Sequence, residues 1–202
     1  MRAPVFSMEN IYLQYLRCRK KKRNTINALR FEYALEDNLY RLQKELCNRS
    51  YAPSRSACFI VNKPKLREIF AADFRDRIVH HILVDVLERV FEPKFIHDSY
   101  ACRRVKGTHR AADRLQLFMR RETRNNTQPA YYLQLDIRGF FFNIDKQILY
   151  DMVEQRVRDE TIRWLARTVI FHDCTKDAIV KGNRALFRRI PPHKTLFQGQ
   201  NL

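Results

Sequence analysis

The clearest hydrophobic pattern in the centre of the chain is a two-residue alternation. Between residues 131 and 136, which read YYLQLD, the apolar residues Tyr131, Leu133 and Leu135 occupy every second position and the last residue is Asp136. This alternation predicts a strand with one apolar face and a carboxylate at its end. A carboxylate there suits a divalent cation and its phosphates, although the same residue can simply cap the next turn.

Other segments repeat their apolar residues at a helical period of about 3.6. The first is 1–16, and the longest unbroken stripe runs from Ile26 to about Leu46. Further stripes predict helices at 76–91, 145–157 and 162–170, and we expect the last two to pack against the sheet. Asp73 and Asp145 are placed as N-caps of the helices that follow them.

A basic hairpin is predicted near residues 58–70. Short β-branched and aromatic runs at 58–61 and 69–70 flank a turn that carries Lys63, Lys65 and Arg67. Cations at such a tip can close over a triphosphate, with Arg as a planar fork and Lys as a point charge. A solvated turn is the alternative that the residues themselves leave open.

The charge balance points to a polyanionic partner. The 202 residues contain 39 Lys plus Arg against 22 Asp plus Glu, a net charge of +17, and nucleic acid is the commonest partner of such a surface. Six cations fall in residues 17–23, either as a contact to an RNA or hybrid backbone or as a solvated loop.

Composition also narrows the class of protein. No apolar run reaches the roughly 18 residues of a membrane span, so we expect no membrane partner. The five cysteines are scattered and form no CxxC pair, which favours reduced thiols and a cytoplasmic protein. His80 and His81 are adjacent and fit no metal motif, so we interpret them as structural. Without a Gly/Ser linker, residues 1–202 are expected to form one unit.

Five segments, taken in order, resemble bacterial reverse transcriptases of the group II intron and diversity-generating retroelement type. They are KPKLREI at 63–69, DRIVHHIL at 76–83, FEPKF at 91–95, SYACRRVKGTHRA at 99–111 and DIRGFF at 136–141. The resemblance spans about residues 25–200. It implies an α+β, reverse-transcriptase-like fold: an N-terminal helical region and fingers in about 1–98, and a template-contact segment with the first part of the palm in about 99–202.

The resemblance also implies roles around residue 136. Asp136 matches the first catalytic carboxylate, which would hold Mg²⁺, with Mn²⁺ possible, together with the backbone carbonyl of Ile137. Phe141 matches the aromatic steric gate that favours deoxynucleotides by filling the space of a 2′-hydroxyl. Such an enzyme would be an RNA-directed DNA polymerase that extends a primer by two-metal phosphoryl transfer.

Further roles follow for the cations. Arg67 matches the arginine that grips the incoming deoxynucleoside triphosphate, and either Lys63 or Lys65 would assist it. Arg103 and Arg104 match the segment that lies along the template. The implied partners are an RNA template, an RNA–DNA hybrid, deoxynucleoside triphosphates and possibly an accessory retroelement protein.

The second carboxylate motif of that family is missing, because no Asp-Asp pair occurs in the sequence. We therefore expect an incomplete right-hand polymerase fold, with fingers and a partial palm but no thumb, that is truncated before the Asp-Asp motif and inactive in isolation. The alternative is a non-catalytic fragment that binds nucleic acid through its basic surface.

Overall fold

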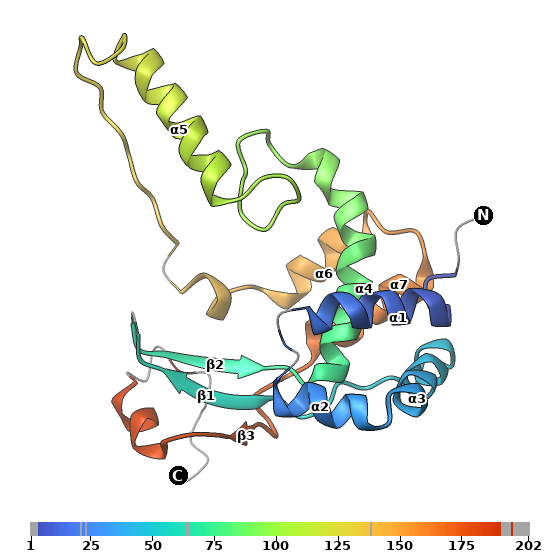
Figure 1. The fold of residues 1–202 in the computed structure, drawn as a ribbon. Helices are drawn as coiled ribbons and strands as arrows, with labels where there is room; N and C mark the ends of the chain where they lie inside the picture. Colours follow the sequence, from blue (N-terminus) through green and yellow to red (C-terminus); the bar gives the residue numbers. More distant parts are fainter. Residues whose placement is uncertain are drawn as a thin grey trace. The chain divides into compact units, whose positions relative to one another are not determined.

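The protein is α+β and forms two compact units. A computed structural model describes residues 4–190 and Thr195, apart from Lys21, Arg23, Pro64 and Arg138. Unit 1 contains Met1–Leu87 and Phe141–Leu202, and unit 2 contains Glu88–Phe140. The predicted α+β class is confirmed. Figure 1 traces the chain through both units, each of which is described by itself below.

The sheet of unit 1 is built on the predicted hairpin. Strand β1 (Ala57–Val61) pairs antiparallel with β2 (Arg67–Ala71) through every residue of both strands. A two-residue strand, β3 (Ile179–Val180), adds to the other edge of β1 in parallel, which gives the order β2-β1-β3 (Figure 1). The hairpin prediction is confirmed, whereas β3 was not predicted.

Three helices precede the hairpin: α1 (Met8–Arg19), α2 (Ile26–Tyr33) and α3 (Leu35–Cys47). The prediction of one continuous helix from Ile26 to Leu46 is wrong, because Ala34 leaves the helical conformation with φ −130° and ψ 56°. The Asn38 side-chain amide donates to the carbonyl of Phe31 at 2.9 Å, which satisfies a backbone acceptor at the end of α2.

An aromatic cluster joins these helices to α4 (Phe74–Phe91), which begins in unit 1. The ring centroids of Tyr15, Phe31 and Phe74 lie 5.5–6.3 Å apart, and all three side chains are buried. Tyr15 stacks on Phe31 and meets Phe74 edge-on, and the Phe31 and Phe74 rings are tilted to each other. Stacked and edge-on pairs are the favoured geometries of aromatic rings. Around them lie the buried aliphatic side chains of the three helices and α4: Ile11, Leu39, Leu42, Leu46, Ile78, Val79 and Ile82.

A buried carboxylate anchors the start of α4. The Asp73 side chain accepts from the Arg75 backbone N–H at 3.1 Å, in agreement with the predicted cap. Asp76 is only 1% exposed and accepts from the Tyr51 hydroxyl and the Ser54 backbone N–H, each at 2.8 Å. Asp76 therefore fixes the segment before β1 against the first turn of α4.

The predicted helices after residue 145 are α6 (Lys146–Glu154) and α7 (Glu160–Phe171). Asp145 caps α6 as predicted, accepting from the backbone N–H groups of Gln147 and Ile148 at 2.8 and 3.0 Å. The two helices pack on each other, and the Arg167 guanidinium lies over the rings of Tyr150 and Phe171. A 3-10 helix, η3 (Arg184–Arg189), follows β3.

Unit 2 contains η1 (Glu92–Lys94), a loop, and α5 (Thr108–Glu122), and η2 (Phe140–Phe142) lies at its boundary with unit 1. The predicted strand at 131–136 is wrong, because residues 131–137 form no strand and are exposed. A strand is stabilised by ladder hydrogen bonds to a neighbour, and no segment in the described part of the chain pairs with these residues.

Candidate nucleic-acid interface

The hairpin presents its three predicted nucleotide-binding cations at one end of the β1–β2 ladder. Lys63 and Lys65 lie in the turn, and Arg67 is the first residue of β2, opposite Val61. All three side chains are exposed, and none has an ion pair or side-chain hydrogen bond within the described residues. A backbone ladder therefore gathers three positive charges that are open to an anionic ligand.

The hairpin has one buried side chain on each strand, Cys58 on β1 and Glu68 on β2. Glu68, adjacent to Arg67 and therefore on the opposite face of β2, is 7% exposed and accepts from the Thr195 hydroxyl at 2.9 Å. Burial raises the pKa of the Cys58 thiol to about 12, and the charges of Glu68 and Cys174 add to this effect. Cys58 is therefore an inert thiol of the hairpin core.

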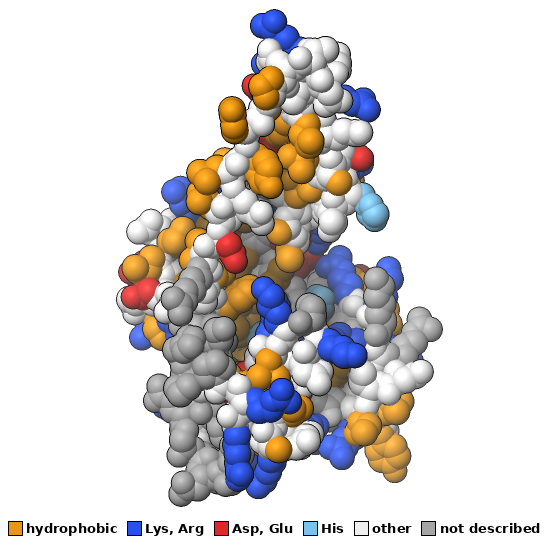
Figure 2. Space-filling model, turned by 90° about the vertical axis from the view of Figure 1, so that its left-hand side faces the viewer, with side chains coloured by type: hydrophobic (Ala, Val, Ile, Leu, Met, Phe, Trp, Pro, Cys, Tyr) orange, Lys and Arg blue, Asp and Glu red, His pale blue; other side chains and the backbone are white. Residues whose placement is uncertain are grey.

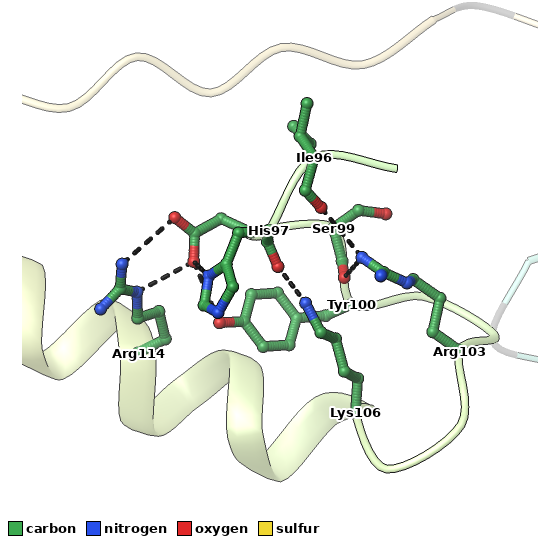
Figure 3. A network of polar contacts seen from close by, with 8 residues as sticks. Ile96, His97, Ser99, Tyr100, Arg103, Lys106 and Arg114 are labelled. Carbon is green, nitrogen blue, oxygen red and sulfur yellow. Dashed lines mark hydrogen bonds and ion pairs between the residues drawn. The ribbon is translucent and has the colours of Figure 1, made fainter. Parts of the chain in front are cut away.

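Arg103, one of the two predicted template contacts, is bound by its own loop in unit 2. Its guanidinium donates to both carboxylate oxygens of Glu92 at 2.7–3.2 Å. It also donates to the carbonyl oxygens of Ile96 and Ser99 at 2.9 Å each (Figure 3). The Arg103 side chain is only 10% exposed. Its observed contacts hold the loop between η1 and α5 together, and its contact with a template stays a prediction.

Arg104 differs from its neighbour in exposure. Its side chain is 63% exposed and forms an ion pair of 2.9 Å with Glu88 near the end of α4. A surface ion pair of this kind is worth little and is readily exchanged for another anion. Of the two predicted template contacts, Arg104 is therefore the more accessible to a phosphate group.

A second set of contacts ties the same loop to α5. Asp98 accepts from the Arg114 Nε at 2.9 Å and from the Tyr100 hydroxyl at 3.1 Å. Lys106 donates to the His97 carbonyl and lies over the Tyr100 ring (Figure 3). The hydrogen bond from Arg114, and lesser ones from His97 and Tyr100, lower the pKa of Asp98 to about 2. Several cations of this loop are thus already neutralised within unit 2.

Asp136 and Ile137 lie next to each other on the extended segment of unit 2. Both side chains are exposed, Ile137 by 68%, and the Asp136 carboxylate has no hydrogen bond or ion pair among the residues that the structure describes. Phe141 lies in η2, which carries its side chain 83% exposed. The predicted site is therefore divided: the hairpin cations and Phe141 belong to unit 1, and Asp136 and Ile137 to unit 2.

The binding of magnesium by Asp136 and the Ile137 carbonyl stays a prediction. Within the described ranges, no group of three or more His, Cys, Asp or Glu side chains is placed to hold a metal ion. Two-metal phosphoryl transfer needs carboxylates that bind both ions, whereas Asp136 is a lone exposed carboxylate. The residues present do not fit a two-metal centre.

The first part of the cation run at 17–23 is helical and not a loop, and its contact with a nucleic-acid backbone stays a prediction. Arg17 and Arg19 belong to α1, which ends at Arg19. Arg17 forms an ion pair of 2.8 Å with Asp85, and Arg19 one of 2.5 Å with Glu32. These carboxylates lie far away in the sequence, which is why the local charge run did not reveal them. Lys21 and Arg23 lie outside the described residues.

The adjacent histidines of α4 behave as structural groups. Burial lowers the pKa of His80, and it also lowers the pKa of His81, where the charge of Arg17 adds to the effect. For His80 the carboxylate of Asp76 opposes the lowering. His80 is half-buried and His81 is exposed on α4, and a lowered pKa favours the neutral form of both imidazoles.

The surface carries both cations and apolar side chains. Figure 2 shows Lys and Arg side chains gathered on the part of unit 1 that includes the hairpin, and hydrophobic side chains gathered over unit 2. The apolar residues of unit 2 that are more than half exposed include Leu115, Leu117, Met119, Tyr131, Tyr132, Leu133 and Leu135. Among the described helices, none combines the length and apolarity needed to cross a bilayer.

Comparison with known proteins gives one weak similarity. No protein-family model matches the sequence. The chain is similar to protein YkfC of Escherichia coli (strain K12), with 27% identity over 146 residues. The match covers 69% of this chain but only 37% of YkfC, so the chain spans little more than a third of that relative's length. The name YkfC states no activity and carries none to this protein.

Proposed function

We propose that this chain forms the fingers and the first palm segment of a reverse transcriptase, an RNA-directed DNA polymerase that uses Mg²⁺ or Mn²⁺. In this role it binds an RNA template, an RNA–DNA hybrid and an incoming deoxynucleoside triphosphate. The proposal rests first on the order of the five motifs along the sequence. Because the residues described do not fit a two-metal centre, the remaining carboxylates would have to come from outside these 202 residues.

The observation that supports this proposal best is the β1–β2 hairpin. Lys63, Lys65 and Arg67 are exposed at one end of a fully paired two-stranded ladder, and no carboxylate in the described residues neutralises them. A triphosphate carries several negative charges on adjacent oxygens, so clustered cations on a rigid support are well suited to it. Lys63 and Lys65 are both exposed, so their exposure does not distinguish which of them would contact the nucleotide.

A second candidate is a nucleic-acid-binding module without catalysis. The observation that favours it is that, among the described residues, the exposed Asp136 carboxylate belongs to no group of three or more His, Cys, Asp or Glu side chains placed to hold a metal ion. The net charge of +17 would suffice for binding a nucleic-acid backbone. The two candidates differ in one property: only the polymerase needs a specific place for a nucleotide.

Photo-crosslinking separates the two candidates. A photoreactive deoxynucleoside triphosphate is added to the chain with a DNA primer on an RNA template and Mg²⁺, and the crosslink is mapped and competed with deoxynucleotide. We expect labelling of the hairpin that falls about tenfold in Arg67→Ala and in whichever of Lys63→Ala or Lys65→Ala removes the contact, because each loses a charge-assisted bond. Lys44→Ala, an exposed lysine of α3, serves as the control. If the chain binds the primer–template but shows no labelling that deoxynucleotide competes away, the second candidate is favoured.

A further inference from the structure

A polar cavity lies in unit 1, and its lining includes none of the residues predicted to bind a nucleotide or a template. It has a volume of about 350 Å³ and is formed where α2, α3 and the start of α4 meet. This volume is within the range of small-molecule sites, about 300–1,000 Å³. From α2 the lining includes Asn27 and Arg30 together with the buried ring of Phe31.

The two helices contribute the same pair of residues at the same spacing. Asn27 and Arg30 lie three residues apart on α2, and Asn38 and Arg41 lie three residues apart on α3. Side chains at i and i+3 share one face of a helix, and all four residues line the cavity. The break at Ala34 between α2 and α3 allows both of these faces to border one space.

The acidic groups of the lining are already engaged, whereas two arginines are not. Glu45 pairs with Arg75, and the Asp73 carboxylate accepts from the Arg75 backbone N–H. The guanidinium groups of Arg30 and Arg41 have no hydrogen bond or ion pair among the residues that the structure describes, and both side chains are exposed. The lining carries three arginines against two carboxylates, a net charge of +1, and its two arginines without a described partner are open to an anion.

The positive character extends to the wall of the cavity. Burial lowers the pKa of Arg75; the carboxylate of Asp76 opposes this, and the charge of Arg41 adds to it. Arg75 is held from several sides, by Glu45, by the Ser54 hydroxyl at 3.2 Å and by the Ala52 carbonyl at 3.3 Å. It is a fixed part of the wall, so a bound anion would meet Arg30 and Arg41 first.

We propose that this cavity binds the phosphate monoester group of a ligand about the size of one nucleotide. Two unpaired guanidinium groups match a dianion better than a singly charged carboxylate, and each offers a planar fork to two oxygens. The Asn27 amide supplies a further donor. The phosphate belongs either to a free nucleotide or to the 5′ end of an RNA strand, which present the same chemistry. This site does not depend on polymerase activity.

The test compares two double variants of the whole chain that lose the same charge. Arg30→Gln/Arg41→Gln removes the two cations of the cavity. Arg156→Gln/Arg158→Gln removes two exposed arginines that follow α6 and lie outside the cavity. The binding of adenosine monophosphate, adenosine, and short RNAs with a 5′ phosphate or a 5′ hydroxyl is measured by calorimetry. Thermal unfolding checks that both variants are folded, as expected for substitutions at exposed positions.

We expect adenosine monophosphate or the 5′-phosphorylated RNA to bind the parent and the control variant alike. The cavity variant should bind that ligand at least about tenfold more weakly, since charge-assisted bonds are lost. If only one of the two ligands binds, that ligand identifies the source of the phosphate. Equal affinity in the two variants would overturn the site. So would binding that is the same with and without the phosphate group.

Discussion

Asp76 is the residue whose role was least visible in the sequence. It lies in the first turn of α4, where any carboxylate is favoured by the helix dipole. In the structure it is buried and receives two hydrogen bonds from the segment before β1. Burial, followed by the charge of Asp76 and its hydrogen bond, raises the pKa of Tyr51, which therefore stays protonated and continues to donate.

Replacing Tyr51 by Phe should destabilise unit 1 by about 1.5–3 kcal/mol, the usual range for a hydrogen bond to a charged group. The ring keeps its packing, and the buried Asp76 carboxylate loses one of its two donors. Urea unfolding followed by circular dichroism measures the change in the free energy of unfolding. Tyr40→Phe is the matched control, because Tyr40 is 64% exposed. Equal midpoints for both variants would contradict this role of Asp76.

At the scale of elements, the loop between η1 and α5 shows how a basic segment is held in place. Its two arginines, Arg103 and Arg104, were predicted to contact a template, and in the structure they pair with Glu92 and Glu88. From α5, Arg114 binds Asp98 of the same loop. The pKa of Asp98 is lowered in the folded protein, so its contacts stabilise this loop above its ordinary pKa of 3.8. That stabilisation is lost as the pH falls towards about 2.

An NMR titration of the Asp98 carboxyl carbon tests this arrangement. We expect a pKa of about 2 in the parent, and a value raised towards 3.8 in Arg114→Gln, since the largest contribution comes from the Arg114 hydrogen bond. Arg110→Gln removes the same charge from an exposed position of α5 and should leave the titration nearly unchanged. An ordinary pKa in the parent would show that the Asp98–Arg114 pair does not form in solution.

The sequence correctly predicted the features that depend only on neighbouring residues. The caps at Asp73 and Asp145 and the hairpin followed from neighbouring residues. Features that need a distant partner were missed or wrong. β3 has two residues and exists only by pairing with β1, and the alternation at 131–136 gives no strand without a neighbour. The local spacing also could not predict that Asp136 and Phe141 fall in different units, because the units are defined by tertiary contacts.

At the scale of the whole molecule, the cations behind the net charge of +17 are not equally available to an anionic ligand. Arg17 and Arg19 are paired with carboxylates of the same unit, whereas Lys63 and Arg67 are not paired within the described residues. A phosphate that approaches Arg17 or Arg19 must displace an existing partner. One that approaches the hairpin displaces only water and counterions, so the hairpin should dominate the salt dependence of RNA binding.

Two variants with the same loss of charge test this distribution. The affinity for single-stranded RNA is measured by fluorescence anisotropy from low to moderate salt, and log affinity is plotted against log salt concentration. Lys63→Gln/Arg67→Gln should reduce the slope by roughly 1.4, twice the value of about 0.7 for each phosphate contact. Arg17→Gln/Arg19→Gln should leave the slope nearly unchanged and instead lower the unfolding midpoint, because Asp85 and Glu32 lose their partners. If the second variant reduces the slope as much as the first, net charge alone governs binding, and the hairpin has no special place in it.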